Sequence, residues 1–300
     1  MAEIAIGARA GVAQGAWRRV RSAARQLRRW PAFSIVVLTL LIVGTVGAPW
    51  IAPYSASEGS TKDGNLPPVF AGGARAHILG TDALGRDMFS RILYGGRVSL
   101  MVAAVVLVVA GTVGTTLGLL SGYLGGWVDE LIMRVVDAKN SIPLILVALL
   151  VAVAFGSTLT ILLILLSLWL WSGYARQVRG EVLRLREMDY VKLARVAGAS
   201  TPRILFRHLL PGVFDTVMVL ATHQVGSVIL TEAGLSFLGA GIPPPTPAWG
   251  SMVNQGLLYL RDAWWVSIVP GLAIGLTVMA FTFLGDWLRD RLDPQLRQLM

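Results

Sequence analysis

Long uncharged stretches separated by short charged ones set the pattern of this 300-residue chain. A helix of about 20 apolar residues crosses the hydrocarbon core of a bilayer. Between Lys139 and Arg176 lie 36 uncharged residues, too many for one crossing, and a Gly-Ser pair at 156–157 divides them. The pattern predicts six membrane-spanning helices, at 33–51, within 98–128, at 140–156, at 158–175, at 213–232 and at 263–285. We expect the third span to reach back toward Leu131, with Pro143 as a kink.

The same pattern divides the chain into five parts. The predicted parts are a cytoplasmic basic amphipathic N-terminal segment (1–30), a first transmembrane helix (31–54), an extracytoplasmic loop with an amphipathic helix (55–97), a core of five spans (98–285) that includes a loop at 176–211, and a cytoplasmic tail (286–300). Six spans leave both termini on one side of the membrane. That side holds 20 of the 26 Lys and Arg residues, so the positive-inside rule assigns it to the cytoplasm.

Composition supports a polytopic membrane protein. Hydrophobic residues make up 55% of the chain and charged residues only 14%, whereas soluble domains carry about 25% charged residues. The chain has no cysteine, which excludes disulfides and thiolate chemistry. The net charge of +9 is spread along the predicted cytoplasmic membrane face. This placement favours contact with anionic lipid over a compact nucleic-acid footprint.

Six arginines between residues 18 and 29 precede the first apolar run. That run, 33–51, is longer than the apolar region of a signal peptide, which has about 7–15 residues. An uncleaved signal-anchor is therefore favoured over a cleaved peptide. The arginine-rich segment itself is equally compatible with an interfacial amphipathic helix and with a disordered basic tail.

Four glycines spaced by four residues follow one another in the second span: Gly114, Gly118, Gly122 and Gly126. On one helix they form a stripe along which another backbone can approach closely. The stripe predicts helix packing, either within this chain or against a partner subunit.

The segment REMDYVKLARVAGASTPRILFRHLLPG (186–212) interrupts the apolar pattern. DYVKLARVA predicts a short helix, and Gly198 stands where a C-cap glycine belongs. Thr201 is expected to cap a second helix, with Pro202 at its first position, until Pro211 interrupts it. A rigid helix–turn–helix tethered by membrane spans suits docking of a partner better than DNA recognition or a solvated connector.

This segment resembles the cytoplasmic coupling loop of binding-protein-dependent ABC importer permeases. The family pattern is Glu-Ala-Ala, three residues, Gly, nine residues, Ile, one residue and Leu-Pro. Four residues match it: Ala194, Gly198, Leu210 and Pro211. Three depart from it: Lys192 at the Glu position, Leu193 at the first Ala position and His208 at the Ile position. Further stretches, covering nearly the whole chain, are similar to permeases for dipeptides, oligopeptides and nickel: 27–54, 79–100, 121–137, 232–250 and 285–294.

The resemblance implies an all-α, multi-pass permease with a cytoplasmic coupling helix in a bacterial or archaeal inner membrane. Such permeases pair with a second, homologous permease, dock one or two ABC ATPase subunits, and receive solute from an extracytoplasmic binding protein. The residues implied in ATPase coupling are Tyr190, Val191, Lys192, Leu193, Ala194, Arg195, Gly198, Leu210 and Pro211. The chain contains no phosphate-binding G-x-x-x-x-G-K-[ST] motif. We therefore expect no enzymatic activity and no cofactor in this chain, with ATP and Mg²⁺ used by the partner ATPase subunits.

The implied solute is a short peptide, with nickel, a glutathione-like compound or another small solute as alternatives. His223 and Gln224 are polar residues in the fifth span, where polar groups are costly. They predict either a place on the translocation path or hydrogen bonding between helices. A secondary transporter is the rival from another class, but we find neither inverted repeats nor mid-membrane charges to indicate one. An intramembrane enzyme is disfavoured because the three histidines are far apart in sequence.

Two features on the predicted outer side of the membrane each lead to a prediction. Asp87 and Arg91 are four residues apart, which predicts an ion pair on one face of an amphipathic helix. Glu232 lies at the outer end of the fifth span, where it predicts a contact for a peptide amine or for the binding protein, or else a structural turn.

Overall fold

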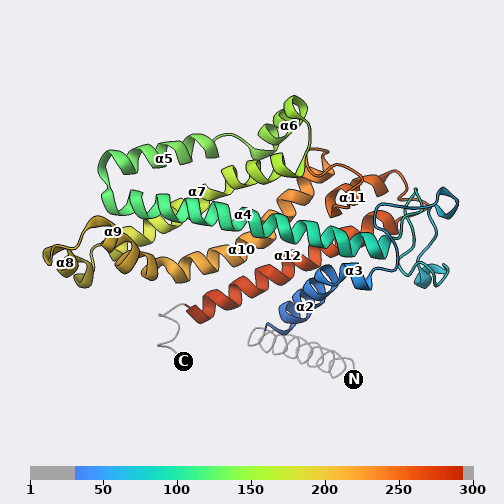
Figure 1. Ribbon diagram of the computed structural model, residues 1–300, viewed down its shortest axis with the longest axis horizontal. Helices are drawn as coiled ribbons and strands as arrows, with labels where there is room; N and C mark the ends of the chain where they lie inside the picture. Colours follow the sequence, from blue (N-terminus) through green and yellow to red (C-terminus); the bar gives the residue numbers. More distant parts are fainter. Residues whose placement is uncertain (1–30, 293–300) are drawn as a thin grey trace, which may run out of the picture.

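The structure, a computed structural model, describes residues 31–292, and all regular elements in that range are helical (Figure 1). The predicted N-terminal segment and the end of the predicted tail lie outside the described residues. The helices are α2 (Ala32–Val46), α3 (Ala48–Ile51), the short 3₁₀ turns η1 (Thr61–Asp63) and η2 (Val69–Ala71), α4 (Met88–Leu124), α5 (Gly126–Asn140), α6 (Leu144–Phe155), α7 (Leu159–Leu185), α8 (Asp189–Val196), α9 (Thr201–Arg203), the π-helical segment η3 (Ile204–Leu209), α10 (Leu210–Phe237), α11 (Trp249–Leu257) and α12 (Trp265–Leu292).

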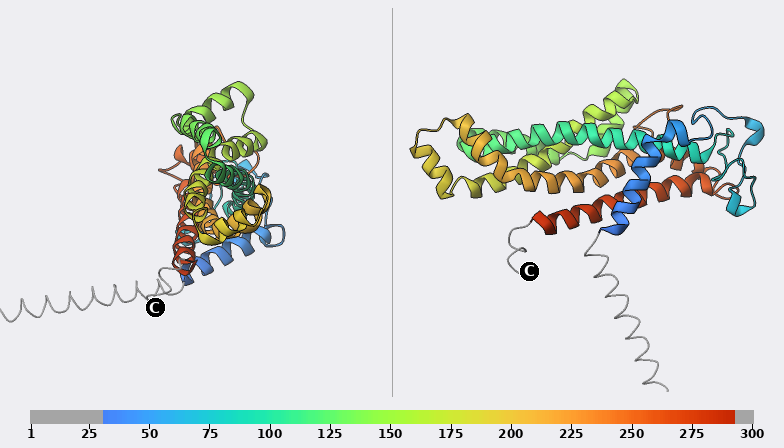
Figure 2. Two further views of the ribbon diagram at one scale, coloured as in Figure 1. Left: turned by 90° about the vertical axis from the view of Figure 1, so that its left-hand side faces the viewer. Right: turned by 60° about the horizontal axis from the view of Figure 1, so that its bottom comes forward.

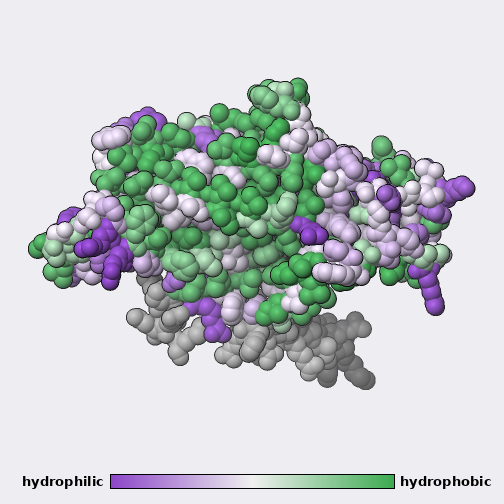
Figure 3. Space-filling model, viewed as in Figure 1, coloured by the Kyte–Doolittle hydropathy of each residue, from purple (hydrophilic) through white to green (hydrophobic). Residues whose placement is uncertain are grey.

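The helices α4, α7, α10 and α12 lie side by side along the long axis of the molecule. α4 packs along α7, α10 packs against both α4 and α12, and α2 crosses α12 obliquely (Figure 2). The segment 186–203, which we call the α8 end, projects at one end of the bundle. The loop 52–87 lies near α11 at the opposite end, which we call the loop end. Between these two ends the surface is mainly hydrophobic (Figure 3).

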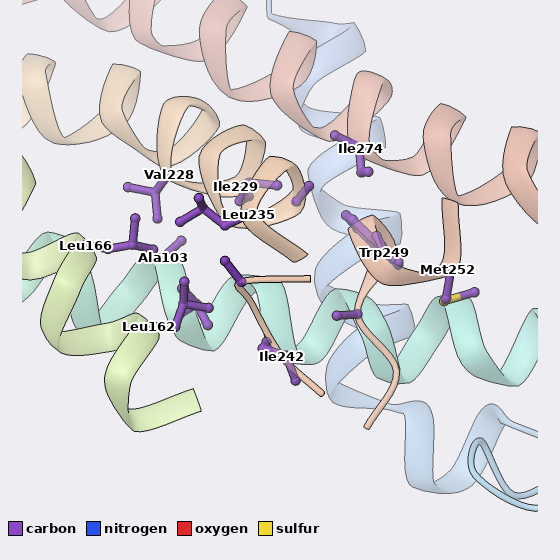
Figure 4. Packing of buried hydrophobic residues seen from close by; sticks show 14 of the residues in the cluster. Ala103, Leu162, Leu166, Val228, Ile229, Leu235, Ile242, Trp249, Met252 and Ile274 are labelled. Atoms are coloured by element: carbon purple, nitrogen blue, oxygen red, sulfur yellow. The ribbon is translucent and has the colours of Figure 1, made fainter. Parts of the chain in front are cut away.

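In the described part of the chain, two buried apolar clusters hold the bundle together. The larger joins α4, α7, α10, α11 and α12, and Figure 4 shows Leu162, Val228, Ile229 and Trp249 among its members. The indole N–H of Trp249 donates to the carbonyl oxygen of Ile92 at 3.0 Å, so this polar atom is satisfied although the side chain is buried. The smaller cluster lies near the α8 end and joins α4, α7, α8, η3 and α10.

Within residues 31–292, four helices are long and apolar enough to cross a membrane: α4, α7, the continuous helix Thr201–Phe237, and α12. The predicted third span is not one kinked helix, because α5 and α6 meet at an angle of 76°. Pro143 has no N–H and its ring clashes with the preceding turn, so the chain leaves one helix before it and starts another after it. Taken as one span, the bent pair brings the number of candidates to five, and α2 is a shorter apolar helix.

The predicted separate amphipathic helix in 55–97 does not form. Asp87 is the N-cap of α4, and its carboxylate accepts a hydrogen bond from the backbone N–H of Ser90 at 2.8 Å. α4 then continues without a break into the second span, so its first turns belong to the same helix as the membrane-spanning part. Residues 52–87 form a loop with two short 3₁₀ turns.

Candidate functional site

α8 is a short helix that a glycine ends. Gly198 has a φ of +79°, and its N–H donates to the carbonyl oxygen of Arg195 at 3.0 Å. The N–H of Ala199 donates to the carbonyl oxygen of Ala194 at 3.0 Å. This pair of bonds is a Schellman motif, which requires a left-handed residue where Gly198 stands. The predicted C-cap is confirmed, and it fixes the direction in which the chain leaves α8.

α8 divides its side chains between an inner and an outer face. Val191 is 0% exposed and belongs to the smaller buried cluster. Leu193 and Val196 are 68% and 86% exposed, and Tyr190 is also exposed. Burial of Val191 holds α8 against the bundle, while the outer face presents apolar side chains that nothing in residues 31–292 covers.

Polar contacts join α8 to its surroundings. The ammonium of Lys192, at the position where the family pattern has Glu, lies 3.5 Å from a carboxylate oxygen of Glu187. The guanidinium of Arg195 lies over the ring of Tyr123, 5.5 Å from the ring centroid, near the end of α4. Each of these contacts is partly exposed, and their summed contribution to stability is small.

The second helix of the segment begins one residue earlier than predicted and is not interrupted at Pro211. Ser200, and not Thr201, is the N-cap, so that Pro202 is the second helical residue. Pro211 does not interrupt the helix, because the π-helical segment η3 precedes it and Leu210 and Pro211 form the first two positions of α10. The wider π-helical turn accommodates a proline that would disrupt a regular α-helical turn.

The end of α7 is fastened to its two neighbours. The guanidinium of Arg179 binds the carboxylate of Asp129 in α5 through two contacts of 2.5 and 2.6 Å. Arg186 donates to the carbonyl oxygen of Gly122 in α4 at 2.8 Å. Since α8 follows α7 directly, these contacts and Val191 together hold the α8 end in a fixed orientation.

The glycine stripe packs α4 against α7 within this chain. A Cβ placed on Gly114 would lie 2.3 Å from the carbonyl oxygen of Trp171, and one on Gly118 would lie 2.7 Å from that of Ala175. A Cβ on Gly122 would meet the side chain of Val182 at 2.7 Å, so each of these glycines allows close contact.

The prediction is wrong for Gly126. α4 ends at Leu124, and the chain turns through Gly125 and Gly126, both of which have positive φ. A Cβ on Gly126 would meet no atom within 4 Å. This glycine serves the turn between α4 and α5 instead of the helix interface.

The structure places His223 and Gln224 on different sides of α10. The imidazole Nε2 of His223 lies 3.3 Å from a carboxylate oxygen of Asp286 in α12. The side-chain nitrogen of Gln224 would lie 3.2 Å from a Cβ placed on Gly173 in α7. Both residues lie at helix interfaces, and their place on a translocation path stays a prediction.

A buried polar network at the loop end was only partly anticipated. The predicted ion pair between Asp87 and Arg91 is absent from residues 31–292, and Arg91 lies 3.6 Å from Asp82 instead. Asp82 also binds the guanidinium of Arg86 at 2.7 Å. Gln255 in α11 accepts from both arginines, at 3.3 and 3.4 Å. The three charged residues of this network, Asp82, Arg86 and Arg91, are visible in the sequence, but their pairing depends on tertiary contacts.

Glu232 is 0% exposed and does not reach the surface of the described chain. Its carboxylate accepts from the hydroxyls of Ser99 in α4, at 2.9 Å, and Ser236 in α10, at 2.8 Å. Of the alternatives for this residue, the structural one agrees with this burial.

A charged side chain lies within the bent pair α5–α6. Lys139 lies at the bend between α5 and α6, and its ammonium donates to the carbonyl oxygen of Trp169 and the hydroxyl of Ser172 in α7. The sequence signal was the cluster Asp137–Asn140 in the middle of the paired α5 and α6.

A bundle of long apolar helices, with a rigidly held helical projection at one end and a folded polar loop at the other, is the architecture of a protein embedded in a membrane. A family model described as "Binding-protein-dependent transport system inner membrane component" matches residues 114–298. The chain belongs to this family, and is thus an inner-membrane permease component of a binding-protein-dependent importer.

Relatives and a solved structure agree with this assignment. Glutathione transport system permease proteins GsiD of Escherichia coli O157:H7 and Shigella sonnei (strain Ss046) are 42% identical over 94% of this chain and 90% of theirs. A protein of Brucella abortus biovar 1 (strain 9-941), provisionally named as a peptide transport system permease, is 41% identical over 91% of each chain. The MetNI methionine ABC transporter, solved in inward-facing conformations, has a chain with the same fold, with a TM-score of 0.54, 19% identity, and coverage of 69% of this chain and 98% of that chain. The family decides in favour of an ATP-driven importer over a secondary transporter.

Proposed function

We propose that this chain is one of two membrane subunits of an ATP-driven importer for short peptides, and that the α8 end couples it to the ATPase. The outer face of α8 carries this proposal, because a short helix with exposed apolar side chains is held rigidly on the bundle by Val191 and the Gly198 cap. A rigid contact can transmit a conformational bias that a flexible loop would absorb.

In this proposal the α8 end faces the cytoplasm, as the excess of Lys and Arg on that side favours. α2 with α3 serves as the first span and the bent pair α5–α6 as the third, which gives six crossings with both termini in the cytoplasm. The loop end then faces the extracytoplasmic binding protein. ATP and Mg²⁺ belong to one or two partner ATPase subunits, and a second, homologous permease completes the path.

The names of the relatives support the class of solute. Permeases that are 42% identical over nearly the whole chain belong to glutathione transport systems, and another relative is provisionally named for peptides. Glutathione and short peptides share a peptide backbone and at least one carboxylate, so similar translocation paths suit both solutes. Nickel or another small solute is the alternative.

Affinity purification from native membranes, with mass spectrometry, tests the assembly. We expect a second permease and Walker-motif ATPases to co-purify. The purified complex, reconstituted in proteoliposomes with its binding protein, should take up glutathione or alanyl-alanine only with ATP. A chain that purifies alone, with uptake independent of ATP, would refute the proposal.

A further inference from the structure

Lys139 carries a positive charge that no carboxylate in residues 31–292 neutralises. Its ammonium donates to the carbonyl oxygen of Trp169 and the hydroxyl of Ser172, and it lies 5.0 Å from the centroid of the Trp169 ring. The nearest acidic side chain on the same helix, Asp137, is bound to Arg176 at 2.8 Å. Ser172 also donates to the side-chain oxygen of Asn140 at 3.3 Å, which links the bend to α7.

This charge lies at the middle depth of the bundle. Ser172 is about 20 Å along α7 from its first residue, given a rise of about 1.5 Å per residue. The neighbouring Trp171 packs on Gly114, near the centre of the uncharged run 98–128. A charged side chain at this depth is costly, and proteins place it toward the bundle interior or toward water.

The surface around Lys139 is unsuited to lipid. Asn140, Ser141 and Pro143 are exposed, and no side chain caps the first turn of α6, which follows them. The side chains of the nearby ion pair between Asp137 and Arg176 are also more than half exposed. Figure 3 shows hydrophilic patches over α5 within the hydrophobic belt. Non-helical backbone at membrane depth occurs only where protein covers it or where it lines a water-filled cavity.

We propose that Lys139, with Asn140 beside it, is a solute-contact site on the translocation path that binds the carboxylate of the passing peptide. The inference rests on the proposed function, because it takes a short peptide as the solute. The ammonium would exchange its bonds to Trp169 and Ser172 for a charge-assisted hydrogen bond to the solute. The existing partners are neutral, so the exchange does not break an ion pair.

Cysteine labelling tests the site without any knowledge of the solute. Because the chain has no cysteine, Asn140→Cys introduces its single thiol. In the assembled complex we expect an anionic methanethiosulfonate to react about tenfold faster than a cationic one, because the Lys139 ammonium attracts the first reagent and repels the second. Lys139→Met should remove that preference. Val108→Cys, an exposed position near the same depth on an apolar face of α4, should react with neither reagent.

An unreactive Asn140→Cys, or a preference that survives Lys139→Met, would overturn the proposal. Selectivity in transport supplies the second measurement. Uptake of alanyl-alanine and of its C-terminal amide is compared at saturating binding protein in wild type, Lys139→Met and Lys139→Arg. The binding protein acts equally in all three, so only a change in the acid-to-amide ratio reports on this site.

We expect Lys139→Met to lower the acid-to-amide ratio about tenfold, as loss of a hydrogen bond to a charged group predicts. Lys139→Arg should retain most of it, and Arg134→Met, which removes an exposed cation elsewhere on α5, should leave it unchanged. An equal fall for both peptides would assign Lys139 a structural role only. If wild type transports neither peptide, the proposed solute is wrong, and the labelling experiment still decides whether the site attracts anions.

Discussion

Glu232 in α10 and Ser99 in α4 are joined by a hydrogen bond of 2.9 Å between the Ser99 hydroxyl and the carboxylate, and both residues are buried. Ser236, one turn further along α10, donates to the other carboxylate oxygen at 2.8 Å. A buried carboxyl group that accepts two hydroxyl bonds connects two long helices near the loop end.

Replacing Glu232 with alanine should destabilise the protein. The change leaves two buried hydroxyls without their acceptor and opens a cavity, for a cost of about 2–4 kcal/mol. Glu232→Gln keeps an acceptor oxygen and should cost about 1 kcal/mol or less. Thermal unfolding of both variants and of wild type in detergent checks this. Equal unfolding midpoints for Glu232→Ala and Glu232→Gln would show that the hydroxyl–carboxylate hydrogen bonds contribute nothing.

Gly118 should not tolerate a larger side chain. A Cβ there would meet the backbone oxygen of Ala175 at 2.7 Å, so leucine would force α4 and α7 apart. We expect Gly118→Leu to lower the unfolding free energy by about 3 kcal/mol, at the upper end of overpacking effects. Thr116→Leu, an exposed position on the same helix, provides the matched control and should leave stability nearly unchanged.

Asp82 should be the critical member of the network at the loop end. Asp82→Ala leaves the buried guanidiniums of Arg86 and Arg91 without their carboxylate, which costs about 3–5 kcal/mol. Adding Arg86→Met to Asp82→Ala removes one stranded charge and should recover part of that loss. A double-mutant cycle on unfolding midpoints measures the coupling, and strictly additive effects would contradict the assigned contact.

The sequence predicted where the helices lie better than where they end or how they bend. Uncharged runs reveal apolar helices because composition alone determines their partition into lipid. Pro143 separates α5 from α6, whereas the helix continues through Pro211. The difference depends on the π-helical turn η3 before Pro211 and on tertiary packing. The partners of Asp87 and Arg91 likewise depend on how the loop 52–87 folds back, which helical spacing does not encode.

Gly198 should be essential to coupling because of its backbone conformation. Valine is strained at a φ of +79°, whereas asparagine tolerates the left-handed region. We expect Gly198→Val to insert and fold but to separate ATP hydrolysis from transport, and Gly198→Asn to retain most of the activity. Parallel assays of ATPase rate and uptake in proteoliposomes check this. Full transport by Gly198→Val would contradict the assignment of 186–212 as the coupling segment.

The two faces of α8 should respond to mutation in opposite ways. Val191→Ala removes buried methyl groups and should cost about 1.5 kcal/mol of stability, while binding of the ATPase survives. Leu193→Asp changes an exposed side chain, so stability should stay within about 0.5 kcal/mol. Its charge, however, should prevent a partner from covering the outer face.

Co-purification of the ATPase with each variant distinguishes the two effects. Leu258→Asp makes the same change at an exposed leucine of the loop end, and it should leave ATPase binding intact. Loss of the ATPase from Leu193→Asp alone would identify the outer face of α8 as the docking surface. Retention of the ATPase by Leu193→Asp would move the contact elsewhere on the α8 end, because a buried aspartate without a partner is too costly for a tight apolar interface to accept.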